Sequence, residues 1–242
     1  MSVLPYKESD AGKKQQVAEM FNNISGKYDL LNRLLSAGVD VSWRKKALKM
    51  LKDDKPFYLL DVATGTADFA LMAQKILKPG KITGIDISEG MLAIGAKKIK
   101  EAGLETTIDL EVGDCEALVF PDASFDAVTV AFGVRNFEDL DKGLKEINRV
   151  LKIGGKVLIL EFSKPDTFPL NYLFNFYFKH ILPLIGKMIS KDTAAYSYLP
   201  ESVQVFPYGS NFLDKLKEAG FEKTKWKKLT FGISSVYTGT KF

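Results

Sequence analysis

The chain has 242 residues, of which 46% are hydrophobic, and a net charge of +4 from 34 basic and 30 acidic side chains. This length suits one α/β domain with extensions, and the near balance of charge gives no reason to expect a nucleic-acid partner. Cys115 is the only cysteine, which excludes an internal disulfide and a cysteine-rich metal site and is typical of a cytoplasmic protein.

The N-terminal quarter is predicted to be helical. Residues 1–12 contain no apolar segment of signal-peptide length and are expected to be frayed. Over 13–35 apolar side chains recur on one stripe, which predicts a helix that could divide at Gly26. A second helix is predicted over 41–51, and both are expected to lie over or beside the sheet. Tyr28 lies on the first stripe, either as a core aromatic or facing a substrate.

Residues 57–69 are the segment around which the chain is organised. The apolar run 57–60 predicts a buried parallel strand, a turn of small residues follows, and Asp68 opens a helix. Such a turn presents backbone N–H groups and a helix start to a nucleotide-like ligand. Gly65 is the only glycine in a turn that carries three in dinucleotide-binding proteins. This disfavours a pyrophosphate and favours a smaller, uncharged part of a cofactor.

Polar residues end the next two predicted strands. The strand over 81–86 ends in Asp86, where a carboxylate can accept hydrogen bonds from ribose hydroxyls. The strand over 107–112 is followed by Asp114 and Cys115. Because the carboxyl ends of parallel strands meet at one edge of a sheet, these residues are expected to line one crevice.

A fourth strand, predicted over 125–132, leads to Arg135 and Asn136. This pair could orient or stabilise an anionic oxygen. The structural alternative is that Arg135 pairs with Glu138 or Asp139 at a helix start. The order of elements up to this point resembles that of an S-adenosylmethionine-dependent methyltransferase.

The remaining regular elements complete an α/β sheet. They are a helix over 138–151 stopped by glycines 154 and 155, a strand over 156–162, a helix over 211–219 and an antiparallel hairpin of strands over 222–229 and 232–241. The lysines at 223, 225 and 227 are expected to form a solvated or edge-guarding face, with a membrane-facing role as the alternative.

Residues 164–206 are predicted to be an insert before the last two strands. The aromatic-rich stretch 168–189 falls short of the roughly 18 consecutive apolar residues of a transmembrane helix. It is either a helix packed on the domain or a lid over a lipophilic substrate that also touches a membrane surface. His180, the only histidine, lies here and is more often structural than catalytic in such a context.

Two long segments identify a family. Residues 28–43 and 149–163 are similar to the two signatures of the ubiquinone/menaquinone-biosynthesis C-methyltransferases, and residues 132–136 and 237–242 fit as well. The resemblance extends from Gln15 to the C-terminus. It implies the fold class: an α/β, Rossmann-like, seven-stranded class I S-adenosylmethionine-dependent methyltransferase sheet, with N-terminal helices and a helical insert before the last two strands.

The resemblance also implies which residues hold S-adenosyl-L-methionine. Beside the Gly65 turn, the matching positions are Thr66, Asp86, Asp114 and Cys115. The chain departs from the family at two further positions. Ala67 stands where a glycine is frequent, which adds a methyl expected beside the methionine moiety, and Ala131 stands where a serine is frequent, which removes a hydroxyl.

The reaction implied is C-methylation of a prenylated, demethylated quinol, above all demethylmenaquinol in the final step of menaquinone biosynthesis. A benzoquinol of the ubiquinone pathway or another lipophilic small molecule is the alternative. Arg135 and Asn136 would stabilise a quinolate oxygen, and Tyr28 or His180 would move the proton. No metal is expected to take part. A nicotinamide oxidoreductase lacks its pyrophosphate turn here, and a non-enzymatic membrane module would not need Asp86 and Asp114.

The expected organisation is one methyltransferase domain over 1–242. Within it, residues 1–55 are N-terminal helices over the active site, 56–163 the cofactor-binding core, 164–206 an aromatic-rich lid and 207–242 the last helix and hairpin. The expected location is the cytoplasm, with peripheral contact to the inner face of the plasma membrane left open. A homodimer is likewise left open.

Overall fold

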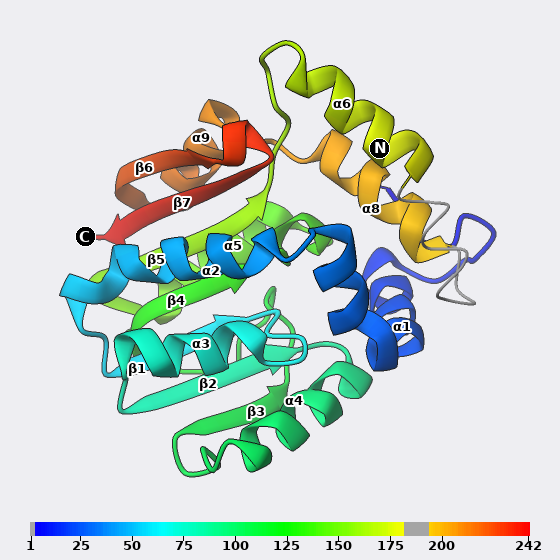
Figure 1. Ribbon diagram of the computed structural model, residues 1–242. Helices are drawn as coiled ribbons and strands as arrows, with labels where there is room; N and C mark the ends of the chain where they lie inside the picture. Colours follow the sequence, from blue (N-terminus) through cyan, green and yellow to red (C-terminus); the bar gives the residue numbers. More distant parts are fainter. Residues whose placement is uncertain (1–2, 182–193) are drawn as a thin grey trace.

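The computed structural model describes residues 3–181 and 194–242, and in this part of the chain seven strands form one sheet (Figure 1). Their order is β3-β2-β1-β4-β5-β7-β6. The strands are β1 (Tyr58–Val62), β2 (Lys81–Asp86), β3 (Ile108–Val112), β4 (Phe125–Ala131), β5 (Leu151–Phe162), β6 (Phe221–Leu229) and β7 (Ser234–Lys241). The first five are parallel and β6 and β7 form an antiparallel hairpin, as predicted; β7 is also antiparallel to β5.

Helices cover both faces of the sheet. One face is packed by α2 (Val39–Leu48), α3 (Asp68–Leu77) and α4 (Glu89–Glu101), and the other by α5 (Leu140–Val150) and α9 (Ser210–Glu218). Each face has its own apolar core, in which the strands contribute side chains to both sides. This double burial explains why the central strands are apolar without alternation.

A third apolar cluster lies beyond the carboxyl edge of the sheet. It joins α1 (Lys13–Leu35) to α6 (Leu170–Phe176) and α8 (Ala194–Val205). Helix α1 runs unbroken past Gly26, so the predicted division does not occur. Short helical turns complete the chain: η1 (Lys49–Asp54), η2 (Val134–Asn136), η3 (Tyr177–Ile181) and η4 (Thr230–Gly232).

The N-terminal segment before α1 is held in place, so the prediction that it frays is wrong for residues 3–12. The buried side chain of Gln16 accepts a hydrogen bond from the Tyr6 backbone N–H at 2.9 Å and donates to the Ala11 carbonyl at 2.7 Å. Val3 and Tyr6 pack against the third cluster. The cause is tertiary packing of α1, which the local sequence does not show.

The boundary between α5 and β5 also differs from expectation. The helix ends at Val150 and β5 begins at Leu151, so glycines 154 and 155 lie within the strand and do not stop the helix. Gly154 has φ 79°, and a Cβ on Gly155 would lie 2.8 Å from the Lys152 carbonyl oxygen. The glycines serve an irregular start of the strand, where pairing with β4 shifts register.

Strand order reverses at β1, which has β2 on one side and β4 on the other. In open α/β sheets a ligand crevice forms where the strand order reverses, beyond the carboxyl ends of the strands. The fold therefore places the loops after β1, β2, β3 and β4 around one crevice, and α1 lies beyond these strand ends (Figure 1).

Candidate active site

The loop after β1 is shaped by buried hydrogen bonds and unusual backbone angles. Ala63, Gly65 and Ala67 all have positive φ, at 54°, 57° and 61°. The buried carboxylate of Asp61 accepts hydrogen bonds from the hydroxyls of Thr64 at 2.7 Å and Thr129 at 2.6 Å. Left-handed alanines are strained, so the surrounding contacts hold this loop in a preformed shape.

Asp86, at the end of β2, faces this loop. Its carboxylate accepts hydrogen bonds from the backbone N–H of Gly65 at 2.8 Å and of Ser88 at 2.9 Å. Burial raises the pKa of Asp86, and these N–H groups oppose the rise by stabilising the anion. Both carboxylate oxygens of Asp86 have further lone pairs, so they can still accept hydrogen bonds from the two hydroxyls of a diol such as ribose.

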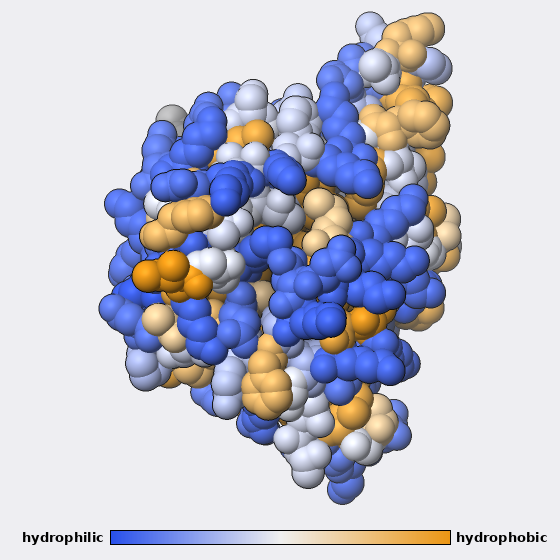
Figure 2. Space-filling model, turned by 90° about the vertical axis from the view of Figure 1, so that its left-hand side faces the viewer, coloured by the Kyte–Doolittle hydropathy of each residue, from blue (hydrophilic) through white to orange (hydrophobic). Residues whose placement is uncertain are grey.

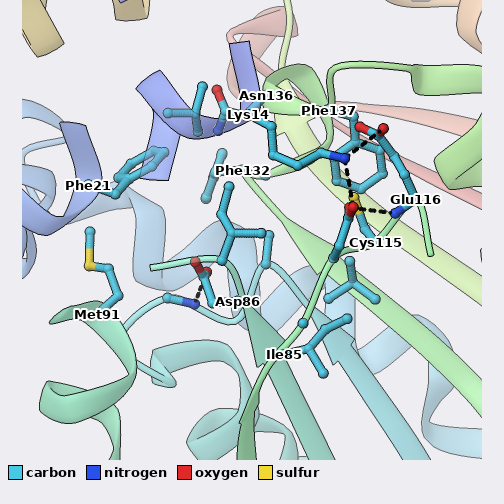
Figure 3. A pocket seen from close by; sticks show the side chains of 18 of the residues that line it. Lys14, Phe21, Ile85, Asp86, Met91, Cys115, Glu116, Phe132, Asn136 and Phe137 are labelled. Carbon is cyan, nitrogen blue, oxygen red and sulfur yellow. Dashed lines mark hydrogen bonds and ion pairs between the residues drawn. The ribbon is translucent and has the colours of Figure 1, made fainter. Parts of the chain in front are cut away.

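Beyond β3, Lys14 from α1 lies against two acids (Figure 3). Its ammonium is 2.6 Å from Asp114 and 3.1 Å from Glu116. Asp114, Cys115 and Glu116 lie close enough to hold a metal ion, but the lysine already supplies their positive charge. Burial raises the pKa of Cys115, with the two acids adding to the rise, so its side chain stays a neutral thiol and a poor ligand.

A first cavity brings most of these residues together. Figure 3 shows Phe21 and Met91 on one side, Asp86 and Ile85 below, and Lys14, Cys115 and Phe137 on the other. The predicted cofactor and catalytic residues that line it are Tyr28, Gly65, Asp86, Asp114, Cys115 and Asn136. The Oδ1 atom of Asn136 is buried and has no hydrogen-bond partner among the described residues, so the cavity offers an acceptor for a ligand N–H.

Thr66 does not line this cavity. Its buried hydroxyl donates to Asp29 at 2.6 Å and accepts from Lys98 at 3.0 Å, in a network behind the loop. The methyl of Ala67 is also buried in the core, packed against Gly95 of α4. The expectation that this methyl lies beside the methionine moiety is therefore wrong, because the left-handed turn directs it away from the crevice. Ala131 does line the first cavity.

A second, larger cavity of about 330 Å³ adjoins the first. Its walls come from α1, α2, α6, α8 and the ends of β4 and β5, and most of its side chains are apolar or aromatic. Phe21, Tyr28 and Phe132 line both cavities. They therefore form the boundary across which a bound cofactor and a bound acceptor would meet.

Arg135 lies in the wall of the second cavity and not in the first. Its Nη1 is 2.7 Å from the carboxylate of Glu161 at the end of β5, and both side chains are buried. The same nitrogen donates to the Phe132 carbonyl, and the guanidinium lies over the Phe162 ring at 5.5 Å. The pairing with Glu138 or Asp139, given above as the structural alternative, does not occur. The Nε atom of Arg135 is buried without a partner among the described residues.

Tyr28 lies at the junction of the cavities, edge-on to Phe21 with ring centroids 5.9 Å apart. Burial raises its pKa, although a hydrogen bond with Asn32 and the charges of Arg135 and Arg44 oppose the rise. The phenol is therefore neutral near pH 7 and acts as a hydrogen-bond donor. His180 is exposed, contacts Phe176 at 5.1 Å and lines neither cavity.

Several polar groups of the site are absent from the predictions above, among them Glu161, Lys14 with its partner Glu116, and the pair Asp40–Arg44. Glu161 could have been found, because it ends an apolar strand as Asp86 does. Lys14 and Arg44 lie on predicted helices among other charged residues, Asp40 directly precedes the second of these helices, and nothing in the pattern separates them from a solvated face.

The comparisons with known structures define the class. An S-adenosylmethionine-dependent methyltransferase from Thermotoga maritima superposes with TM-score 0.66 at 22% identity, covering 93% of this chain and 99% of that one. The [4+2]-cyclase SpnF superposes with TM-score 0.70 at 19% identity, covering 96% and 97%. The chain thus has the Rossmann-like fold of class I methyltransferases, a fold that also carries other chemistry.

Sequence comparison identifies the family. Residues 9–241 match the model of the ubiE/COQ5 methyltransferase family, and the chain belongs to it. It is 49% identical to a demethylmenaquinone methyltransferase of Bacteroides fragilis, over 99% of this chain and 97% of that protein. It is 44% identical to the ubiquinone/menaquinone biosynthesis C-methyltransferase UbiE of Geobacter sulfurreducens, over 95% and 90%.

Proposed function

We propose that this protein transfers a methyl group from S-adenosyl-L-methionine to a ring carbon of demethylmenaquinol, giving menaquinol in the last step of menaquinone biosynthesis. The observation that carries the proposal is the second cavity. It is large and apolar, it contains the buried Arg135–Glu161 pair, and it shares three wall residues with the first cavity. A lipophilic ring with one ionisable oxygen matches that combination of surfaces.

The first cavity fits the methyl donor. Asp86 suits the two ribose hydroxyls, Asn136 Oδ1 is an unpartnered acceptor for an ammonium, and Asp114 is an acceptor at the far end. When bound, the cofactor supplies an electrophilic methyl on a sulfonium. Gly65 and Cys115 line the wall of this cavity. Thr66 holds the loop in place through its hydrogen bonds with Asp29 and Lys98.

The residues of the second cavity activate the acceptor. A quinol hydroxyl has a pKa of about 10, and its anion makes the neighbouring ring carbon nucleophilic. Arg135 is held by Glu161 and aimed at this cavity, so it lowers the cost of that anion, while Tyr28 donates a hydrogen bond. A carbon–methyl bond forms as the sulfur–methyl bond breaks, and loss of the ring proton restores the aromatic ring. The products are S-adenosylhomocysteine, the methylated quinol and one proton.

Residues 164–206 act as the lid in this proposal, so that acceptor and cofactor react away from water. Their described part lines the second cavity through Leu170, Leu173, Phe174, Tyr177 and Tyr198. The organisation into N-terminal helices over the site, core, lid and C-terminal hairpin follows from the same placement. Phe178 lies outside the described side chains.

The outer face of the lid is the proposed contact with a lipid surface. Phe168, Tyr172 and Phe176 are 81%, 69% and 58% exposed, and apolar side chains gather on the lobe at the top of the molecule, where α6 lies (Figures 1 and 2). Leu173 is exposed and also lines the cavity, so the outer face is continuous with the substrate site. In the described part of the chain, no helix has the length and apolarity to cross a bilayer.

Methyl transfer is tested directly. Purified protein is incubated with labelled S-adenosylmethionine and, in parallel, with demethylmenaquinol and demethylated benzoquinol of equal tail length. We expect label in the naphthoquinol ring and little in the benzoquinol. Binding of S-adenosylhomocysteine, measured by calorimetry, is the control for an intact first cavity. Cofactor binding without label in either quinol would overturn the proposed acceptor.

The lipid contact is tested by vesicle flotation. Phe176→Ser is compared with Phe57→Ser, because both rings are 58% exposed. Phe57 directly precedes β1, at the amino ends of the parallel strands, whereas the lid lies beyond their carboxyl ends. We expect the α6 change alone to reduce flotation. Size-exclusion chromatography separates this outcome from a homodimer formed through the same face, which would shift the elution volume of Phe176→Ser in the absence of lipid.

A further inference from the structure

A second buried ion pair lies in the wall of the acceptor cavity, at the corner between α1 and α2. Arg44 donates through Nη1 to the Oδ2 atom of Asp40, and Ser36 donates to Oδ1 at 2.8 Å. Asp40 and Arg44 are only 4% and 7% exposed, and all three residues line the cavity. Among the described acids, Asp40 and Asp68 lie within 4.0 Å of Arg44, and both are approached by the same nitrogen.

The Arg44 pair resembles the Arg135 pair in its surroundings. Arg44 lies over the Phe132 ring at 5.5 Å, and Arg135 lies over the Phe162 ring at 5.5 Å. These two rings are in contact, with centroids 4.7 Å apart. A continuous aromatic surface of two tilted rings therefore has a guanidinium at each of two places, each held by its own buried carboxylate.

Buried charges are costly, so two such pairs in one apolar cavity need an explanation. One pair is sufficient for the single oxyanion that the methyl transfer requires. A guanidinium carries five N–H donors in a fixed fork, and one nitrogen of Arg44 accounts for its contacts with both acids. The remaining donors suit a neutral oxygen of the acceptor.

The chemistry of a para-quinol supplies that oxygen. The ring carbon that accepts the methyl is adjacent to one oxygen and meta to the other. Only the adjacent oxygen can pass electron density to that carbon, so the two oxygens have different tasks. Both arginines line the acceptor cavity only, but Gly133 and Asn136 beside Arg135 line the cofactor cavity, whereas no residue of α2 does. The activating oxygen therefore belongs with Arg135.

We propose that Arg44, held by Asp40 and Ser36, binds the second, non-activating oxygen of the quinol and thereby sets which ring carbon faces the cofactor. This inference rests on the proposed quinol acceptor. It makes Arg44 a specificity-determining residue, so its loss should act on KM and on the choice between acceptors, with little effect on kcat.

The test compares demethylmenaquinol with a 3-prenyl-1-naphthol of the same tail, which keeps the activating oxygen and lacks the second one. The variant is Asp40→Asn/Arg44→Met, because removal of both charges leaves no unpaired buried ion. We expect KM for the quinol to rise about tenfold, the scale of one lost charged hydrogen bond, with kcat within about threefold. KM for the naphthol should not change, and Arg44→Lys should restore part of the affinity for the quinol.

The matched control is Lys97→Met/Glu101→Gln, an ion pair with the same i,i+4 spacing on the exposed face of α4, which should change neither KM. An equal rise in KM for both acceptors would show that Asp40–Arg44 only holds the helix corner. The wild-type protein gives an answer that needs no variant: equal KM for quinol and naphthol overturns the inference. Methylation of neither acceptor overturns the proposed function itself, and the inference with it.

Discussion

At the scale of single residues, the site depends on charges that are buried and paired. Arg135 and Glu161 come from η2 and the end of β5, and each would be costly to bury without the other. Lys14 pairs with the buried Glu116 and with Asp114, and Lys14 and Asp114 are themselves partly exposed. Each pair fixes a side chain at a cavity wall, which is what a preorganised site requires.

Replacing Arg135 should reduce turnover without loss of cofactor binding. Arg135→Lys keeps the charge but loses the planar fork, and Arg135→Ala should lower kcat further, by about a hundredfold, the scale of one lost oxyanion donor. Because the missing function is anion stabilisation, a rise from pH 7 to pH 9 should partly restore the alanine variant. Steady-state kinetics with calorimetry of S-adenosylhomocysteine provides the measurement. A deficit equal at both pH values would leave Arg135 with a structural role.

Asp61 predicts a specific pH dependence of stability. Burial raises its pKa to about 6 from 3.8, so the folded state binds this proton more tightly than the unfolded state. Its contribution to stability is therefore present below pH 4 and is lost as the pH rises to about 6, by at most ~3 kcal/mol. Asp61→Asn has no carboxyl group at this position, so its free energy of unfolding does not fall for this reason between about pH 4 and pH 6. The stability of the variant relative to wild type should therefore increase as the pH rises through that range. Urea unfolding at several pH values checks the trend, and a constant difference would contradict it.

At the scale of elements, α1 is joined to the start of α4 by hydrogen bonds of polar side chains. Ser88 caps α4 by accepting a hydrogen bond from the Met91 N–H at 3.2 Å. The same hydroxyl donates to Asn22 of α1 at 2.7 Å, and Asn22 also accepts from the Gly90 N–H. One side chain thus joins the start of α4 to the helix that crosses the cofactor cavity.

Ser88→Ala should cost about 1–2 kcal/mol of stability through loss of the cap. It should also weaken binding of S-adenosylhomocysteine, because α1 loses a contact. Asp139→Ala is the matched control, since the exposed Asp139 side chain caps α5 at 3.0 Å from the Lys142 N–H and makes no hydrogen bond to α1 in the described part of the chain. Thermal unfolding and calorimetry of both variants separate the effects. If Asp139→Ala weakens ligand binding as much, the link through Asn22 has no special role.

At the scale of the whole molecule, the acceptor cavity exists because the two ends of the chain and the insert meet over one sheet edge. Helix α1 comes from the N-terminal region, α6 and α8 from the insert, and η4 from the C-terminal hairpin. A cavity of about 330 Å³ with these walls can hold a ring, while a long prenyl tail has to follow the lid outward.

Phe174→Ser tests this path. Phe174 is 6% exposed and lines the cavity from α6, whereas Tyr172 on the same helix is 69% exposed and outside it. Loss of a buried aromatic contact forfeits roughly 2 kcal/mol, so KM should rise far more for a long-tailed quinol than for a short-chain analogue. Tyr172→Ser, assayed in detergent, should change neither. Equal losses for both acceptors in Phe174→Ser would mean that the ring supports the fold and not the tail.

The strand ends, the helix stripes and the antiparallel hairpin were all predictable from the sequence, because each depends on a local pattern. Apolar runs bounded by small residues located five parallel strands, and the acid at position 86 fell at the end of its strand. The predicted boundaries of helices and strands were wrong where local signals are ambiguous. Glycines 154 and 155 read as a helix stop, although their strand pairs irregularly with β4.

By itself, the sequence determined the class I fold, the family and part of the polar lining of the crevice, such as Asp86 and Asp114, since periodicity and long motifs are properties of the chain alone. Only the tertiary structure decided which charges meet. Lys14 and Asp114 lie far apart in the chain, as do Arg135 and Glu161, and their pairing depends on the order of strands in the sheet. The same packing turned Thr66 away from the cavity and buried Arg44 within it, because burial of a polar side chain is set by its neighbours in space and not by those in sequence.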